Sequence, residues 1–334
     1  MSTPAPYDLA SELYRLAPWE YLEETDMIRI VHPQTGEIAH ISIMGSHGKH
    51  LALALYIGHE ALSRFNLMQE DDPFDPAFPQ LDSMGLVLET RQIQLSFVRR
   101  GELHSYELDA IKKAGKKFRG DNWPMFRSFK PGYVPGALDA AEIVWLTTAI
   151  EQFLAVFPQL EGTCLSTFRI ENDSCDILTR SLKSGAWHTT WTEHMDFSYE
   201  WATPPPSEFL IEKIKRQQRL VDIDCHFQIL QASIGTAGTA TFPYLAVSVE
   251  PKSGFILGME LLSVEKQTFE ELIASVPDVF LKQWDGANIR PASIRVTTIT
   301  TYSMLEIAAE ELNTPMRRYP NLPSIDRVMS ELPI

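Results

Sequence analysis

Cysteine is scarce in this chain, which has 3 cysteines among 334 residues. Cys164, Cys175 and Cys225 stand far apart and form no CxxC pair. A disulfide framework needs an even set of cysteines at regular spacing. The sequence therefore argues against a disulfide-stapled module and favours reduced thiols that pack as ordinary side chains in a reducing compartment.

The chain also has few basic residues and no long apolar runs. The chain has 29 basic against 44 acidic side chains, a formal charge of −15, which disfavours non-specific contact with nucleic acid or anionic lipid. No segment approaches 18 consecutive apolar residues, and the N-terminus lacks a basic start followed by an apolar run. We expect a cytoplasmic protein without a membrane segment.

Catalytic signatures are absent from the sequence. It contains no GxSxG, no HExxH, no Walker loop and no cysteine beside a histidine. These absences leave the function unknown and favour a non-catalytic binding or interaction protein, for which a protein is a candidate partner. We expect no cofactor, and an enzyme is the less favoured class.

The first half of the chain predicts an α+β domain. A helix is expected over residues 7–17, and three strands follow in "MIRIVHP" (27–33), "IAHISIMG" (38–45) and "HLALALYIG" (50–58). Gly-containing turns join these strands, which is typical of an antiparallel meander. The stretch "LVLETRQIQLSFVRRGEL" (86–103) predicts two further strands.

The hexapeptide "GSHGKH" (45–50) lies between two of these strands. A phosphate loop needs its glycines between a strand and a helix N-terminus, so Gly45 and Gly48 are interpreted as turn residues with positive φ. His47 and His50 remain metal-ligand candidates, along with His40 and His59. No cysteine or carboxylate stands beside them at a recognised ligand spacing.

The stretch from Lys112 to Tyr133 combines basic and aromatic residues. Seven lysines or arginines face one aspartate, and five aromatic residues interleave with them. Such a pattern is typical of single-stranded nucleic acid binding, but a structural loop with a basic surface would look the same. The candidates for anion or nucleic-acid binding are Lys112, Lys113, Lys116, Lys117, Arg119, Trp123, Arg127 and Lys130.

A long helix and a second meander complete the first half. Asp139 and Glu142 fit a capping box at the start of an apolar helix that runs to about Phe157. Strands are then expected over 164–172, 174–183 and 186–201. In the last of these, His188, His194 and Asp196 would share one face and form a weak candidate metal site.

Three successive prolines at 204–206 form a stiff spacer between two expected domains. The first is an N-terminal α+β domain over 1–203, in which helices pack on the antiparallel sheet. The second is a C-terminal mixed α/β domain over 207–334. A chain of 334 residues exceeds the size at which one core usually keeps growing.

The second half has a regular element order. Strands are expected at 220–234, 244–250 and 255–265, followed by a helix at 268–284, a strand at 292–300 and a helix at 302–313. This order resembles that of a ribonuclease H-like fold. The resemblance implies carboxylates that hold two divalent metals for phosphodiester cleavage.

The carboxylates of that fold can be placed in part on this sequence. Asp222 or Asp224 matches the first strand of the resemblance, and Glu270 or Glu271 matches its first helix. The fourth strand carries no acid from 293 to 300, so a metal-dependent hydrolase or nuclease would need Asp222, Asp224 and Glu271 together with a third acid that the sequence does not identify.

A second resemblance covers more of the chain. The stretches "LAPWEYLEETDMIRIVHPQTGEIAHISIMGSHGKHLALALYIGHEAL" and "FRGDNWPMFRSFKPGYVPGALDAAEIVWLTTAIEQFL" look like the N-terminal module of an uncharacterised family of bacterial two-domain proteins. "YLAVSVEPKSGFILGMELL" and "PASIRVTTITTYSMLEIAAEEL" look like its partner module. The resemblance implies bacterial origin and two modules, without an activity to transfer.

Overall fold

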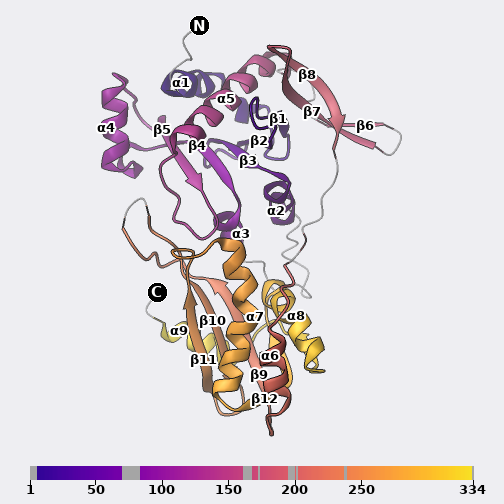
Figure 1. Ribbon diagram of the computed structural model, residues 1–334. Coiled ribbons are helices and arrows are strands. Elements are labelled where there is room, and N and C mark those ends of the chain that lie inside the picture. Colours follow the sequence, from indigo (N-terminus) through magenta and orange to yellow (C-terminus); the bar gives the residue numbers. More distant parts are fainter. Residues whose placement is uncertain are drawn as a thin grey trace. The chain divides into compact units, whose positions relative to one another are not determined.

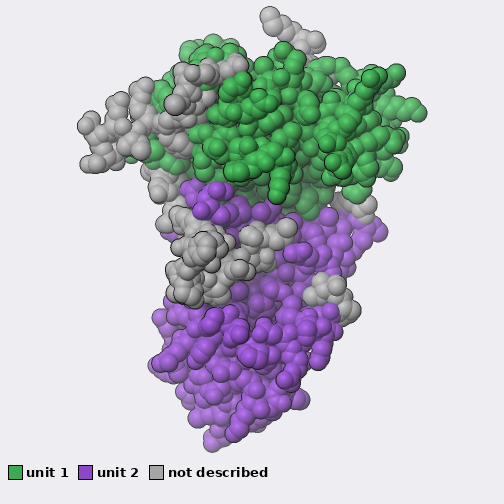
Figure 2. Space-filling model, turned by 180° about the vertical axis from the view of Figure 1, so that it is seen from behind, with its two compact units in different colours: residues 1–65, 90–130, 135–198 green, residues 66–89, 131–134, 199–334 purple. Residues whose placement is uncertain are grey.

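A computed structural model of the chain describes residues 6–69, 83–160, 168–171, 174–194, 200, 202–236 and 239–332. Contacts divide the chain into two compact units, coloured separately in Figure 2. Unit 1 comprises 1–65, 90–130 and 135–198, and unit 2 comprises 66–89, 131–134 and 199–334. The expected α+β class is confirmed, in two parts. A single domain boundary at the three prolines stays a prediction.

The sheet of unit 1 follows the order β5-β4-β3-β2-β1-β7-β6, with β8 paired to β7 (Figure 1). Its strands are β1 (Ile28–Val31), β2 (Ile38–Met44), β3 (Ala52–Ile57), β4 (Gln92–Val98), β5 (Trp123–Phe129), β6 (Phe168–Glu171), β7 (Ser174–Lys183) and β8 (Ala186–Glu193). Strands β1 to β5 pair antiparallel in sequence order, so the expected meander is confirmed.

The second meander joins the same sheet. Strands β6, β7 and β8 pair antiparallel with one another. Strand β7 then pairs parallel with β1, with Arg29 opposite Thr179 and Ile30 opposite Arg180. This parallel contact places residues separated by about half of the chain side by side.

Helices cover the sheet of unit 1. They are α1 (Pro6–Leu16), α2 (His59–Gln69, whose last residues belong to unit 2), α4 (Ser105–Lys113) and α5 (Ala140–Leu160), with short 3-10 helices η1 (Pro18–Glu20) and η2 (Arg100–Glu102). The expected capping box at α5 is confirmed, because Glu142 N–H donates to Asp139 Oδ1 and Asp139 N–H donates to Glu142 Oε2, both at 2.9 Å.

Helix α5 is the main core helix of unit 1. Trp145, Ile150, Phe153 and Phe157 are buried in one apolar cluster with alternate residues of β1 to β4 and with α1. Among the described residues, α5 is also the helix long and apolar enough to cross a membrane by length and composition. Half of that stretch is buried inside the protein.

Three local expectations can be compared with the backbone. Gly45 and Gly48 have φ values of 118° and 71° in the β2–β3 connection, which confirms their interpretation as turn residues. The expected strand at the start of 86–103 is wrong, since α3 (Ser83–Glu89) is a helix. The segment 112–133, expected as a loop or a nucleic-acid contact, contains the edge strand β5.

Unit 2 holds a five-stranded sheet in the order β11-β10-β9-β12-β13. Its strands are β9 (Arg219–Ile229), β10 (Tyr244–Glu250), β11 (Phe255–Leu262), β12 (Ile289–Val296) and β13 (Met316–Arg318). Strands β9, β10 and β11 pair antiparallel, whereas β12 pairs parallel with both β9 and β13. Both sheets of the protein are therefore mixed.

Helices lie on both faces of this second sheet. Helices α6 (Glu208–Lys215), α7 (Phe269–Gly286) and α8 (Ile299–Glu311) build the larger apolar cluster on one face. Helix α9 (Pro323–Glu331) packs on β9 and β10 from the other face, where Ile325 and Val328 belong to one apolar cluster with Leu245 and Val247. A ribonuclease H-like identity for this arrangement stays a prediction.

Candidate functional site

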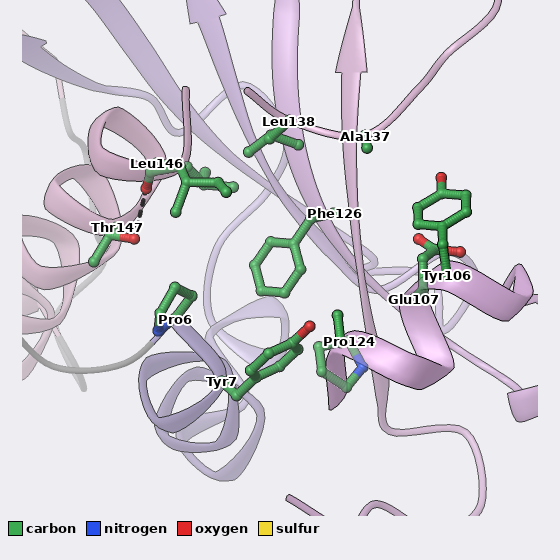
Figure 3. Close-up of a pocket in the computed structure, with 12 residues that line it drawn as sticks. Pro6, Tyr7, Tyr106, Glu107, Pro124, Phe126, Ala137, Leu138, Leu146 and Thr147 are labelled. Atoms are coloured by element: carbon green, nitrogen blue, oxygen red, sulfur yellow. Dashed lines mark hydrogen bonds between the residues drawn. The ribbon is translucent and has the colours of Figure 1, made fainter. Parts of the chain in front are cut away.

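A pocket of about 320 Å³ opens in unit 1 between α1, α4, β5 and the first turns of α5 (Figure 3). Most of the groups that line it are apolar. The lining residues are Pro6, Tyr7, Tyr106, Glu107, Ala110, Pro124, Phe126, Ala137, Leu138, Ile143, Leu146 and Thr147. Concave, mostly apolar sites with a few polar groups are typical of small-molecule binding.

Glu107 supplies the charged group of the pocket wall. It lies in the first turn of α4, where its Oε2 accepts from the His104 backbone N–H at 2.7 Å. The same oxygen accepts from Arg127 Nη2 at 3.0 Å, and Oε1 accepts from Nη1. The two side chains are 9% and 8% exposed. Strand β5 and helix α4 are thus joined by a buried, two-pronged ion pair.

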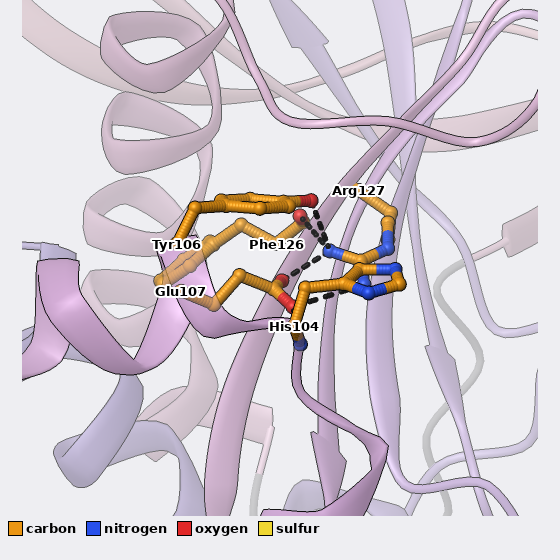
Figure 4. A network of polar contacts seen from close by, with 5 residues as sticks. All are labelled: His104, Tyr106, Glu107, Phe126 and Arg127. Carbon is orange, nitrogen blue, oxygen red and sulfur yellow. Dashed lines mark hydrogen bonds and ion pairs between the residues drawn. The ribbon is translucent and has the colours of Figure 1, made fainter. Parts of the chain in front are cut away.

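Arg127 also fixes the residues next to Glu107. Its Nη1 lies 3.3 Å from the Tyr106 hydroxyl and 3.2 Å from the Phe126 carbonyl oxygen (Figure 4). His104 stacks on Tyr106 with ring centroids 5.5 Å apart. This network holds Tyr106 and Glu107 in place on the wall of the pocket.

The two tyrosines of the pocket stay protonated at neutral pH. Burial raises the pKa of Tyr7, and the negative charge of Glu107 raises it further. Burial also raises the pKa of Tyr106, against an opposing effect of Arg127. Tyr7 packs edge-on against Phe126, with ring centroids 5.5 Å apart. The pocket therefore presents two neutral phenols beside one carboxylate.

Lining hydroxyls other than the phenols are already engaged. Thr147 donates from Oγ1 to the Ile143 carbonyl oxygen at 2.6 Å within α5. The lining set includes no histidine, cysteine, serine or lysine. It therefore offers no nucleophile paired with a general base, and the carboxylate of Glu107 is held by Arg127.

The structure separates the basic candidates of the segment 112–133. Lys112, Lys113, Lys117 and Arg119 are exposed near the end of α4 and in the turn after it. The remaining basic candidates form ion pairs: Lys116 with Asp8, Lys130 with Asp139 and Glu142, and Arg127 with Glu107. Arg127 is buried, so it does not offer its charge to a phosphate at the surface.

Trp123 is engaged within the protein as well. Its ring lies 5.9 Å from that of Phe118, and the guanidinium carbon of Arg100 lies 5.8 Å from its centroid. Base stacking needs an open aromatic face beside a continuous basic track. Nucleic-acid binding through this stretch stays a prediction, with Lys112, Lys113, Lys117 and Arg119 as its exposed residues.

The histidine candidates lie at separate places. His50 lies 3.1 Å from the Gln94 amide nitrogen, and His47 lies 3.1 Å from the Ser46 hydroxyl. His188 is exposed on β8, and Asp196 lies outside the described residues. Two of the candidate histidines, His40 and His194, lie close to a common partner, Arg29.

That partner disfavours a metal ion. Arg29 Nε lies 3.4 Å from His40 Nε2, and Arg29 Nη2 lies 3.4 Å from His194 Nδ1. A buried guanidinium between two imidazoles repels a cation. In the part of the chain that the structure describes, no group of three or more His, Cys, Asp and Glu side chains could hold a metal ion.

The carboxylate candidates of unit 2 have structural partners. Asp224 is fully buried on β9, where its two oxygens accept from Arg295 Nε at 2.6 Å and from the Ser324 hydroxyl. Asp222 accepts from the Ser293 hydroxyl at 2.6 Å. A metal-dependent role for them stays a prediction.

The helix candidates for the same role stand at the start of α7. Glu271 forms a capping box with Thr268, to whose backbone N–H its Oε2 binds at 2.8 Å. Glu270 lies in the same first turn. Acidic side chains are favourable there because of the helix dipole, without any metal.

No sequence pattern identified the pocket residues Tyr7, Tyr106, Glu107 and Phe126. The available signal was local: Glu107 stands three residues after His104, at the position of a helix-capping carboxylate. Nothing in the sequence connects residue 7 with 107 or 126, because they meet only when α1, α4 and β5 pack together.

Comparisons with known proteins match the chain in two parts. The family model of the domain of unknown function DUF7309 matches residues 5–180, and that of the domain of unknown function DUF6930 matches residues 210–333. Searches of curated proteins and of solved structures gave no match. All residues of the pocket fall within the first match. The chain belongs to the DUF7309 family, and residues 210–333 match the model of DUF6930.

Proposed function

We propose that unit 1 is a non-catalytic binding domain for a small, mainly apolar molecule. The observation that carries this proposal is the pocket of about 320 Å³, whose wall is apolar except for Tyr7, Tyr106, Glu107 and the internally bonded Thr147. Such a composition buries the body of a ligand and uses the few polar groups to orient it.

The support of the pocket wall favours binding without large rearrangement. The Arg127–Glu107 ion pair connects α4 to β5, and Arg127 also contacts the Tyr106 hydroxyl. Side chains fixed in this way lose little further freedom when a ligand binds, which favours affinity. Because no lining histidine, cysteine or lysine stands ready for chemistry, a binding role accounts for the pocket better than catalysis.

We also propose a ribonuclease H-like architecture for unit 2, without its metal chemistry. Three antiparallel strands followed by β12 and β13, both in parallel pairs, support the proposal. The engagement of Asp224 by Arg295 and Ser324 argues against metal binding at that strand. Unit 2 is then a scaffold or partner module rather than a nuclease.

A cytoplasmic location in a bacterial cell is part of the same proposal. The bacterial assignment depends on the family resemblance of the sequence. Cys225 is buried, and burial raises the pKa of its thiol. A buried, protonated thiol is inert and suits a reducing compartment. Fractionation of cells that express the protein would test the location.

Ligand binding can be tested with N-phenyl-1-naphthylamine, an uncharged aromatic probe whose fluorescence rises in apolar surroundings. We expect saturable binding to one site on the full chain. Ala110→Trp fills the pocket from an exposed position of α4 and should weaken binding about tenfold or more by steric exclusion. Ala114→Trp, just beyond the same helix and outside the pocket, is the matched control.

Two outcomes would contradict the proposed function. One is the absence of saturable probe binding to the intact protein. The other is equal binding by the Ala110→Trp and Ala114→Trp variants, which would place the probe elsewhere. Circular dichroism and thermal melting of both variants establish that they are folded, so that a loss of binding reports on the pocket.

A further inference from the structure

The charged group that lines the pocket is negative. Glu107 lines it, whereas the lining residues include no lysine, arginine or histidine. Arg127, which neutralises Glu107 from the other side, does not line the pocket. The raised pKa of Tyr7 agrees with this geometry, because Glu107 adds to the effect of burial and no cation opposes it. The cavity side of the ion pair is therefore negative.

Glu107 keeps capacity for one more hydrogen bond. Its Oε2 accepts from Arg127 Nη2 and from the His104 backbone N–H, whereas Oε1 accepts from Arg127 Nη1. Each carboxylate oxygen can accept about two hydrogen bonds, so one acceptor position remains at Oε1. An N–H group of a ligand in the pocket can use that position.

Three aromatic rings line the same pocket. Tyr7 comes from α1, Tyr106 from α4 and Phe126 from β5, and all three line the pocket together with Glu107 (Figure 3). Tyr7 and Phe126 meet at an interplanar angle of 76°, so their faces point in different directions. The faces of aromatic rings attract cations, and several rings at an angle form a cage for an ammonium group.

We infer that the pocket selects an organic cation, a small apolar molecule that carries one amine or alkylammonium group, with the cationic end against Glu107 and the aromatic rings. The inference rests on the proposed function, since it names the class of ligand for the same pocket. The apolar residues from α5 and the preceding loop, such as Leu138, Ile143 and Leu146, hold the hydrocarbon body.

An anionic ligand does not fit the same wall. The guanidinium of Arg127 is taken up by Glu107, the Tyr106 hydroxyl and the Phe126 carbonyl. A ligand carboxylate would meet the carboxylate of Glu107 at close range in surroundings of low dielectric, which is repulsive. A neutral ligand would leave the remaining acceptor of Glu107 without a charged donor.

Three ligands with one carbon skeleton test the inference: 3-phenylpropylamine, 3-phenylpropan-1-ol and 3-phenylpropanoate. Each is titrated against the wild-type protein that holds N-phenyl-1-naphthylamine, and its displacement constant is measured at pH 7. We expect the displacement constant of the amine to be about tenfold lower than that of the alcohol, and the carboxylate to bind most weakly of the three.

The variant Glu107→Gln tests which residue causes the preference. The amide retains an oxygen for the His104 N–H but removes the negative charge and leaves Arg127 uncompensated. We expect the order to invert, with the carboxylate binding more tightly than the amine. Glu102→Gln is the matched control, because Glu102 accepts from the Arg99 backbone N–H at the start of η2 and lies outside the pocket.

A second variant keeps the test decisive if Glu107→Gln does not fold. Phe126→Leu preserves apolar volume and removes one ring, so the advantage of the amine over the alcohol should shrink while the alcohol binds much as before. Equal displacement by the three ligands on the wild-type protein, or the tightest displacement by the carboxylate, would overturn the inference. Failure of the fluorescent probe to bind at all would instead overturn the proposed function.

Discussion

Arg127 on β5 and Glu107 on α4 form an ion pair in which both side chains are less than a tenth exposed. The residues are 20 positions apart in the chain and come from an edge strand and from the helix that precedes it. The pair holds one wall of the pocket, since Glu107 lines the cavity and Arg127 holds Tyr106 beside it.

Arg127→Met should destabilise unit 1 by about 3–5 kcal/mol, because it leaves the Glu107 charge buried without an oppositely charged partner. The double variant Glu107→Gln/Arg127→Met should recover most of that loss. The measurement is the free energy of unfolding in urea. Arg99→Ala is the control, since the Arg99–Asp121 pair is exposed and contributes less than about 1 kcal/mol. A similar loss of stability in Arg127→Met and in Arg99→Ala would contradict the prediction.

His40 should make the stability of unit 1 depend on pH. Burial, followed by the charges of Arg29, His194 and His59, lowers the pKa of His40 to about 3. In the unfolded chain this imidazole takes up a proton below about pH 6.5, whereas in the folded protein it stays neutral until about pH 3. The contribution of neutral His40 to the stability of unit 1 is therefore present above about pH 6.5. It is lost as the pH falls from about 6.5 to about 3.

The variant His40→Gln measures this contribution. Wild type should lose about 1.4 kcal/mol per pH unit more than the variant between about pH 6 and pH 4, as one proton is linked to unfolding. His188→Gln, at an exposed position of β8, should keep the slope of the wild type. Chemical unfolding at several pH values provides the comparison. Parallel slopes for wild type and His40→Gln would refute the prediction.

Asp224 and Asp222 should respond differently to replacement by alanine. Asp224→Ala removes a buried acceptor of Arg295 and of Ser324 at the start of α9, so we expect a loss of about 2–4 kcal/mol in unit 2. Asp222 is exposed and binds one hydroxyl, so Asp222→Ala should cost less than about 1 kcal/mol. Hydrogen exchange in β9 and α9 reports the difference.

Metal binding at Asp224 would distinguish a scaffold role of unit 2 from a role as a metal-dependent hydrolase. A calorimetric titration of the intact protein with magnesium, manganese or zinc should give no binding heat at Asp224, because its two oxygens are already taken. Binding heat in the wild type that disappears in Asp224→Ala would favour a metal-dependent role and contradict the scaffold interpretation of unit 2.

Gly258 on β11 should not tolerate a side chain. A Cβ at this position would lie 2.3 Å from Gln283 Cγ. Gln283 cannot easily move away, since it accepts from the Ser248 hydroxyl at 2.6 Å and donates to the Ala246 carbonyl oxygen at 3.1 Å. We expect Gly258→Ala to cost about 1–3 kcal/mol through overpacking.

The control for this substitution is Gly286→Ala at the end of α7, where a Cβ meets open space. It should be neutral or stabilising by up to about 1 kcal/mol, because alanine favours helix more than glycine does. Thermal unfolding of both variants measures the difference. Equal melting temperatures would show that Gln283 can be displaced at little cost.

The elements that could be predicted from the sequence are those that local chemistry specifies. Apolar and polar residues alternate in the early strands, Gly45 and Gly48 supply a turn with positive φ, and Asp139 with Glu142 caps α5. Each signal lies within a few residues of the element that it marks. The first of the two strands expected within 86–103 was wrong because a short apolar run does not distinguish a strand from a helix.

The sequence by itself determined the α+β class, the order of most elements and the division into two parts, because periodicity and capping act over short distances. Only the tertiary structure decided that β7 pairs with β1, that Arg127 is buried against Glu107 and that Tyr7 meets Phe126. These contacts join residues far apart in the chain. They arise from packing between elements, which leaves no periodic pattern in the sequence.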